Sequence, residues 1–141
     1  MSLFTDVGEF HKRFDLPHAD QRGPVVVPFV EFKYRIAFLM EEITEFIEAY
    51  GRSDLTDIAD ALADLVWVAL GTAHYFGVPF DEVWAEVKRA NMTKRPWQEG
   101  DPLKPRNALT FGEVVKPDGW RPPDVLGVLD ARRELFARRR A

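Results

Sequence analysis

The sequence predicts an all-α fold, a helical bundle, and three observations support that prediction. The chain has 141 residues, the length of one domain with a real core. Apolar residues recur at intervals of three and four positions over several stretches, which is the spacing of an amphipathic helix. Glycine and proline stand between these stretches, where helices are expected to end. We therefore expect a single domain over residues 1–141.

The first expected helix is short and covers residues 6–16. Pro17 ends it, because proline cannot continue a helix without losing a backbone hydrogen bond. The connector that follows, residues 17–28, is expected to be irregular or extended. The apolar positions at helical spacing in the first helix are Val7, Phe10 and Phe14.

The second expected helix is long, spans about residues 30–49 and has Gly51 as its C-cap. Its apolar positions recur at three and four and predict one buried stripe. The residues of this expected stripe are Ile36, Leu39, Met40, Ile43, Phe46 and Ile47.

A third helix is expected after Ser53 or Asp54, either of which can cap it. Its interior, residues 57–74, is nearly all apolar apart from aspartates, which predicts a core helix. A fourth helix follows the Gly-Val-Pro break and begins at Asp81. The core helices together are expected to cover about residues 30–94. The inward positions expected on the fourth helix are Val83, Trp84 and Val87.

The C-terminal third is expected to consist of a loop-rich segment, about 95–124, and a short helix, about 125–137. Prolines and glycines recur throughout the first of these segments. Trp97 and Trp120 lie in it and are candidates for a lid over a bound base.

Composition bounds the kind of protein and the chemistry open to it. Hydrophobic residues make up 46% and charged residues 30%, as in ordinary soluble globular proteins. No apolar run approaches 18 residues and the N-terminus lacks a signal-like pattern, so we expect a cytoplasmic protein with no membrane partner. There are no cysteines, so any metal must be held by oxygen or imidazole.

Charge is distributed unevenly along the chain. Residues 41–64 contain eight acids and one base, whereas residues 88–140 contain thirteen bases and seven acids. The net charge of −4 argues against general nucleic-acid binding, and we expect no nucleic-acid partner. The acidic segment has two interpretations: a solvated face, or a set of ligands for divalent cations that in turn bind an anion.

The acids have spacings that favour the second interpretation. Glu41, Glu42 and Glu45 lie within one helical turn and can reach a common ion. Asp60 and Asp64 stand among apolar residues, where burial of an unpaired carboxylate costs several kcal/mol. A base or a metal must then compensate them.

Ligation by carboxylates alone selects a hard ion, Mg²⁺ or Mn²⁺. Magnesium typically bridges carboxylates to phosphate oxygens, so a phosphorylated substrate is expected. The chemistry implied is attack of a metal-activated water on phosphorus, with one carboxylate accepting the proton.

Three ordered motifs resemble the all-α nucleoside triphosphate pyrophosphohydrolase superfamily, which includes MazG-like proteins and phosphoribosyl-ATP pyrophosphohydrolases. The resemblance runs from about Val7 to Pro123. The motifs are Glu41-Glu42-x-x-Glu45, the run Asp60-Ala-Leu-Ala-Asp64, and Asn91-Met-Thr-Lys94.

This resemblance implies a helical bundle completed by dimerisation, as a homodimer or a dimer of dimers. It implies magnesium-dependent cleavage of a nucleoside or deoxynucleoside triphosphate between its α and β phosphates, giving monophosphate and pyrophosphate. Manganese is a possible substitute. The roles implied are catalytic for Glu41 and Glu42, metal-binding for Glu42, Glu45, Asp60 and Asp64, and phosphate-binding for Asn91 and Lys94.

Some alternatives stay open. Relatives usually carry Glu-x-x-Asp on the second acidic helix, whereas this chain has Asp57-x-x-Asp60 and Asp60-x-x-x-Asp64, so Asp57 is an outer candidate ligand. The substrate can instead be phosphoribosyl-ATP. A third possibility is a non-catalytic helical interaction module that retains the fold.

Overall fold

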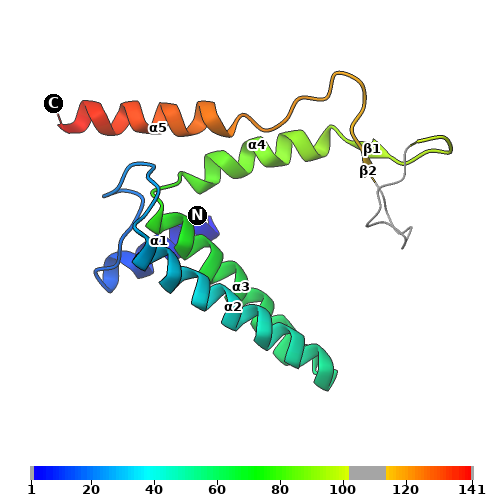
Figure 1. Ribbon diagram of the computed structural model, residues 1–141, viewed down its shortest axis with the longest axis horizontal. Coiled ribbons are helices and arrows are strands. Elements are labelled where there is room, and N and C mark those ends of the chain that lie inside the picture. The colour runs from blue at the N-terminus through cyan, green and yellow to red at the C-terminus, as the bar shows by residue number, and fades with distance from the viewer. Residues whose placement is uncertain (1, 102–113, 141) are drawn as a thin grey trace.

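The structure is a computed structural model that describes residues 2–101 and 114–140. These residues form five helices and one antiparallel pair of two-residue strands, so the predicted all-α fold class is confirmed (Figure 1). The elements are α1 (Leu3–Arg13), α2 (Phe29–Arg52), α3 (Leu55–Tyr75), α4 (Phe80–Met92), β1 (Arg95–Pro96), β2 (Val114–Val115) and α5 (Val125–Arg140).

The helices form two arms that meet near the N-terminus (Figure 1). In the first arm α2 and α3 pack as an antiparallel hairpin, and α1 packs across α3 at the open end of that hairpin. In the second arm α5 runs back along α4. No single described helix is long and apolar enough to span a membrane. Helices α3 and α4 meet the length and composition of a span only when they are counted together, and the chain bends by 117° between them.

Side-chain and backbone caps set the ends of the first three helices. The Ser2 hydroxyl accepts from the Thr5 amide, so α1 begins at Leu3, earlier than predicted. Asp54 caps α3 as expected, accepting from the amides of Thr56 and Asp57. The predicted C-cap at Gly51 is wrong: α2 continues through it, and Ser53 takes the left-handed conformation with φ of 56°.

Two helices are longer than the periodicity suggested. Helix α4 continues to Met92, three residues past Arg89, where the apolar periodicity predicts its end. Trp84 on this helix is exposed rather than inward. Helix α5 continues to Arg140, so the terminal arginines extend the helix rather than follow it. Arginine has a high helix propensity, and nothing in this stretch supplies a stop signal.

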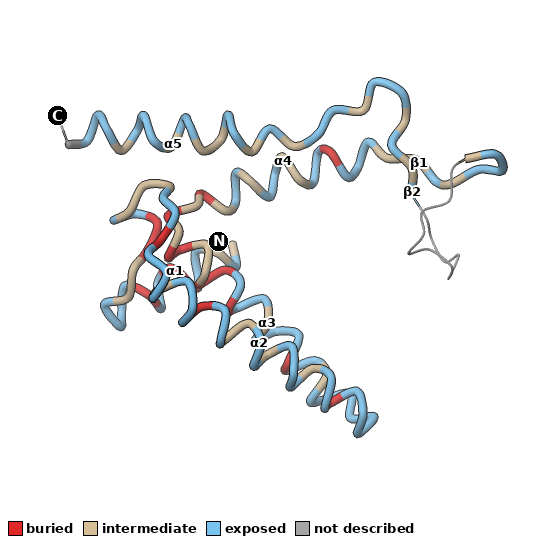
Figure 2. The backbone as a smooth tube through the Cα atoms, in the orientation of Figure 1, coloured by how far each residue is buried: buried red, intermediate tan, exposed pale blue. Residues whose placement is uncertain are grey.

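The buried core is small and lies where α1 crosses the open end of the α2–α3 hairpin (Figure 2). Val7, Val68, Leu70 and Tyr75 are buried there, together with His11 and His74. Further along the hairpin the buried residues are the small Ala49 and Ala61. The hairpin therefore has a well-packed open end and a sparsely packed distal half.

The predicted buried stripe of α2 is wrong by one position. Four residues of the predicted stripe are exposed. The helix presents the adjacent side of its surface to α3 instead. The positions that are buried or half-buried recur at the same helical spacing but include two charged residues. The stripe facing α3 is Arg35, Leu39, Glu42, Phe46 and Ala49, and the exposed stripe is Ile36, Met40, Ile43, Ile47 and Tyr50.

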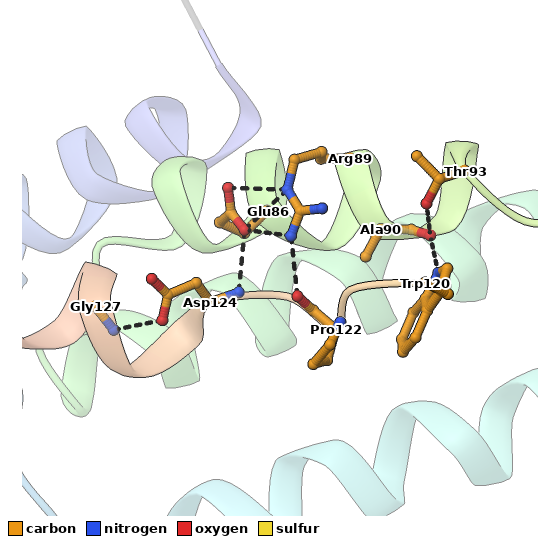
Figure 3. A network of polar contacts seen from close by, with 8 residues as sticks. All are labelled: Glu86, Arg89, Ala90, Thr93, Trp120, Pro122, Asp124 and Gly127. Carbon is orange, nitrogen blue, oxygen red and sulfur yellow. Dashed lines mark hydrogen bonds and ion pairs between the residues drawn. The ribbon is translucent and has the colours of Figure 1, made fainter. Parts of the chain in front are cut away.

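A polar strap holds the segment before α5 against α4 (Figure 3). The Arg89 guanidinium donates to the Glu86 carboxylate and to the Pro122 carbonyl, both at 2.8–2.9 Å. The Glu86 carboxylate also accepts from the Asp124 amide at 3.0 Å. Asp124 in turn accepts from the Gly127 amide at the start of α5, so the strap sets where α5 begins.

Candidate functional site

The acidic residues gather on the distal half of the α2–α3 hairpin. Because the two helices are antiparallel with a tight turn between them, the glutamates of α2 face the aspartates of α3 at similar heights. A groove of about 330 Å³ runs between them, lined by Glu45, Glu48, Ala49, Arg52, Asp57, Asp60 and Ala61. The structure thus brings together acids that the sequence separates by up to fifteen positions.

Glu42 stands at the centre of the acidic cluster and is half-buried in the stripe that faces α3. Burial raises the pKa of its carboxyl group, and the negative charges of Glu45, Asp64, Glu41 and Asp60 raise it further. Both causes disfavour the ionised form. A cation placed among these five groups would act against the second cause and favour the ionised form of Glu42.

The predicted burial of Asp60 and Asp64 is wrong. Both side chains are exposed, although they stand in an apolar sequence. The reason is that the apolar neighbours Leu62 and Val66 are also exposed, at 45% and 44%, so this part of α3 has no core to enter within one chain. The desolvation argument for a compensating cation therefore does not apply to these two aspartates in the single chain.

Asp57 has a base as its partner. Its carboxylate lies 2.7 Å from Arg52, the one base of the acidic segment, and both side chains are about half exposed. An ion pair this exposed contributes little to stability. It does neutralise Asp57, so the groove acids without an ion pair among the described residues are Glu45, Glu48 and Asp60.

The carboxylates fit a hard divalent ion in donor type but do not converge on one point. Among the described residues, no group of three or more Asp, Glu or His side chains is arranged to hold a metal ion. The oxygen donors are of the kind Mg²⁺ prefers, and they project from two facing helices. Binding an ion here would require side-chain rotations that bring the repelling carboxylates together.

Asn91 and Lys94 form a pair of their own. The Lys94 ammonium donates to the Asn91 side-chain oxygen at 2.6 Å, at the C-terminal end of α4. That end lies apart from the acidic hairpin, because α4 diverges from α2 and α3 (Figure 1). The structure therefore joins the two predicted phosphate-binding residues to each other but not to the carboxylates of the same chain.

The two tryptophans proposed as a lid serve local structure. The Trp120 indole donates to the Ala90 carbonyl at 2.7 Å, and the Lys116 ammonium lies 4.1 Å from the centre of its ring (Figure 3 shows the first contact). The Trp97 indole donates to the Asp101 carbonyl at 3.1 Å. Both rings have their N–H groups engaged within the second arm.

The open end of the hairpin holds buried polar groups, and sequence reasoning missed the burial of one of them, Arg35. His74 accepts from the Ala19 amide and donates to the Phe4 carbonyl, which defines its neutral form. His11 contacts the Pro17 carbonyl at 2.6 Å. Arg35 donates to α3. The signal for Arg35 was present, since it lies four residues before Leu39 on the stripe that faces α3.

Comparison with known proteins places the chain in a family. The phosphoribosyl-ATP pyrophosphohydrolase family matches residues 7–91, more than half of the chain, and the chain belongs to that family. The family falls within the all-α, MazG-like nucleoside triphosphate pyrophosphohydrolase superfamily. A search of curated proteins finds no match. The matched region begins within α1, at Val7, and holds the α2–α3 hairpin and nearly all of α4. It ends at Asn91, before Lys94 and the C-terminal residues that the sequence resemblance had included.

The protein is accordingly an enzyme of the pyrophosphohydrolase class, a hydrolase that acts on acid anhydrides of nucleotide-like substrates. The acidic hairpin is the part of the matched region whose side chains suit that chemistry.

Proposed function

We propose that this protein hydrolyses the anhydride bond between the α and β phosphates of a nucleotide and releases pyrophosphate. The observation that carries the proposal is the crowding of four carboxylates from two facing helices around Glu42, inside the region matched by a pyrophosphohydrolase family. Such a cluster is unfavourable by itself and becomes favourable when it holds cations that bind phosphate oxygens.

Magnesium is the proposed cofactor, with manganese as a substitute. Glu42, Glu45, Asp60 and Asp64 would hold it, and Glu41, on the same helix face, would accept the proton of the attacking water. The bound ion would offset charge on the leaving pyrophosphate and lower the pKa of the water. The carboxylates of α2 and α3 would orient the ion and the attacking water.

Two substrates are compatible with this chemistry. Phosphoribosyl-ATP is favoured by the description of the matched family. A nucleoside or deoxynucleoside triphosphate is favoured by the wider superfamily to which the motifs point. Both contain the same triphosphate, so the acidic hairpin would act on them alike. The choice rests with groups that contact the base and the sugar.

We further propose that the protein acts as a homodimer or a dimer of dimers. The exposed apolar stripe of α2 supports this, because Met40 and Ile47 are each 63% exposed and lie on one helical face with Ile36 and Ile43. A second copy packed on that stripe would complete a four-helix bundle. It would also offer a route for Asn91 and Lys94 of one chain to approach phosphate held by the other.

The deciding experiment measures pyrophosphate release from phosphoribosyl-ATP and a panel of ribo- and deoxyribonucleoside triphosphates, with and without magnesium. Metal-dependent release with monophosphate as the co-product is expected, and the preferred substrate separates the two candidates. If folded protein releases no pyrophosphate from any of these substrates, a non-catalytic helical module would be favoured.

A further inference from the structure

Arg35 is a buried cation that joins the two helices of the acidic hairpin. It is 8% exposed. Its Nε donates to the Thr72 hydroxyl at 3.1 Å and one terminal nitrogen donates to the Val68 carbonyl at 2.9 Å, both on α3. The guanidinium carbon also lies 5.0 Å from the centre of the Tyr75 ring. One side chain of α2 thus makes two hydrogen bonds and an aromatic contact to α3.

This cation is buried without a carboxylate partner in residues 2–101 and 114–140. Burial lowers the pKa of its guanidinium, which reflects the cost of removing the charge from water. The fold also leaves space for it: a Cβ at Gly71 would lie 3.1 Å from a terminal nitrogen of Arg35 and 3.0 Å from His11. An apolar side chain would fill this space at lower cost, so the charge itself has a use.

The position of Arg35 relative to the acids indicates that use. The acidic stretch lies between two links that hold α2 to α3. At the turn, Ser53 and Asp54 join the helices, and the Arg52 to Asp57 ion pair lies beside them. At the open end, Arg35 links α2 directly to α3, and Arg22 from the connector bridges Glu31 on α2 to the Tyr75 carbonyl on α3. Between these links, carboxylates on the two helices face one another and repel.

We propose that Arg35 is a positioning residue that holds α2 and α3 together against the repulsion of the acidic stretch, at the separation from which their carboxylates share a cation. The consequence for metal binding rests on the proposed function, whereas the effect on helix separation does not. Arg35 itself would not contact metal or substrate. Lysine at this position would keep the charge and donate to only part of the acceptor set, because it lacks the planar fork of donors.

The helix separation tests the inference directly. The chain has no cysteine, so spin labels at Thr44→Cys on α2 and Ala63→Cys on α3, both exposed positions, report one distance. Labelled protein is diluted with unlabelled chain, so that distances within one chain dominate the electron-spin measurement. Arg35→Met is expected to lengthen and broaden this distance, and Arg35→Lys to do so less. Thr72→Val, which removes one acceptor with little change of shape, is expected to fall between Arg35→Lys and Arg35→Met.

Lys33→Met is the matched control, because Lys33 is exposed on the same helix and its loss changes the charge equally. Circular dichroism confirms that each variant keeps its helices. A distance in Arg35→Met equal to that in Lys33→Met would overturn the inference, whatever the protein does with metal.

Binding of Mn²⁺ alone, followed by its electron-spin signal, gives the second readout. Arg35→Met is expected to weaken manganese binding about tenfold, the size typical of residues that orient metal ligands, with partial recovery in Arg35→Lys. Equal manganese affinity in Arg35→Met and in the control Lys33→Met would refute the positioning role. Wild-type protein that binds no manganese would instead refute the proposed metal site, and the label distance would still decide whether Arg35 holds the helices.

Discussion

The two halves of the α2–α3 hairpin differ in how their polar side chains are placed. At the open end, Arg35, His11 and His74 are buried, and each makes hydrogen bonds to backbone or hydroxyl groups of a neighbouring segment. In the distal half, the carboxylates of Glu45, Asp60 and their neighbours are exposed beside apolar side chains that are exposed as well.

The difference shows which half is complete within one chain. The buried Arg35, His11 and His74 are satisfied by groups of the same chain, so these three side chains need no partner from outside it. The distal half combines mutual repulsion with uncovered apolar surface, and both are relieved only by something outside the chain. In the proposed function, a cation would relieve the first and a second copy would relieve the second.

Removal of one carboxylate from the distal half should give the largest effect on activity. Glu45→Gln is expected to reduce metal-dependent pyrophosphate release to background, because the amide is a poorer ligand for a hard cation. The thermal midpoint should stay the same or rise, since one source of repulsion is lost. Glu134→Gln on α5, another exposed helical glutamate, serves as the control. Retained activity in Glu45→Gln would show that Glu45 does not belong to the active site.

Gly77→Ala should give the largest loss of stability at the open end. Gly77 has φ of 64°, and an added Cβ would collide with the carbonyl oxygens of Arg22 and Gly23. Backbone strain of this kind costs on the order of 1–3 kcal/mol before the collision is counted. Gly119→Ala is the matched control, because its φ is 74° but its Cβ would meet open space. Equal unfolding free energies for the two variants would show that the close approach at Gly77 is unimportant.

The histidines make the open end sensitive to pH. Burial lowers the pKa of both His11 and His74 from the ordinary value of 6.5. The unfolded chain then binds more protons than the folded one below that pH, so stability should be full above pH 6.5 and fall as pH drops through it toward the folded-state values.

Thermal unfolding at pH 7.5 and 5.5 checks the sign of this effect. His74→Gln should lower the thermal midpoint at both pH values. The difference in midpoint between pH 7.5 and pH 5.5 should be smaller than in the wild-type protein. A wild-type midpoint that rises on acidification would contradict the assignment of neutral, buried histidines, unless Glu45→Gln removed the rise and so traced it to the acidic half.

The smallest effect is expected from Arg52→Gln. The ion pair with Asp57 is exposed and screened by salt, so the thermal midpoint should change little. Its loss frees Asp57 to join the groove, and a modest gain in manganese affinity is therefore expected. A strong loss of manganese binding would instead assign Arg52 a positioning role like that of Arg35.

The sequence predicted the helices well and the burial of their faces poorly. The cap of α3 was correctly narrowed to Ser53 or Asp54, and Asp54 takes that role, because an N-cap is a local hydrogen bond between neighbouring residues. The buried face of α2 was displaced by one position, because hydrophobicity favoured Ile36 and Met40 while the helix turns Arg35 and Glu42 toward α3. Periodicity identifies an apolar face but does not say which partner covers it.

The sequence by itself determined the all-α class, the helix order and the acidic clusters at helical spacing, because each depends on residues within one or two turns of each other. The tertiary structure decided which acids share a groove, that Asp57 is neutralised by Arg52, that Lys94 pairs with Asn91 away from the carboxylates, and that Arg35 joins α2 to α3. These features depend on how the antiparallel helices align and where α4 leaves them, and packing over long sequence separations sets both.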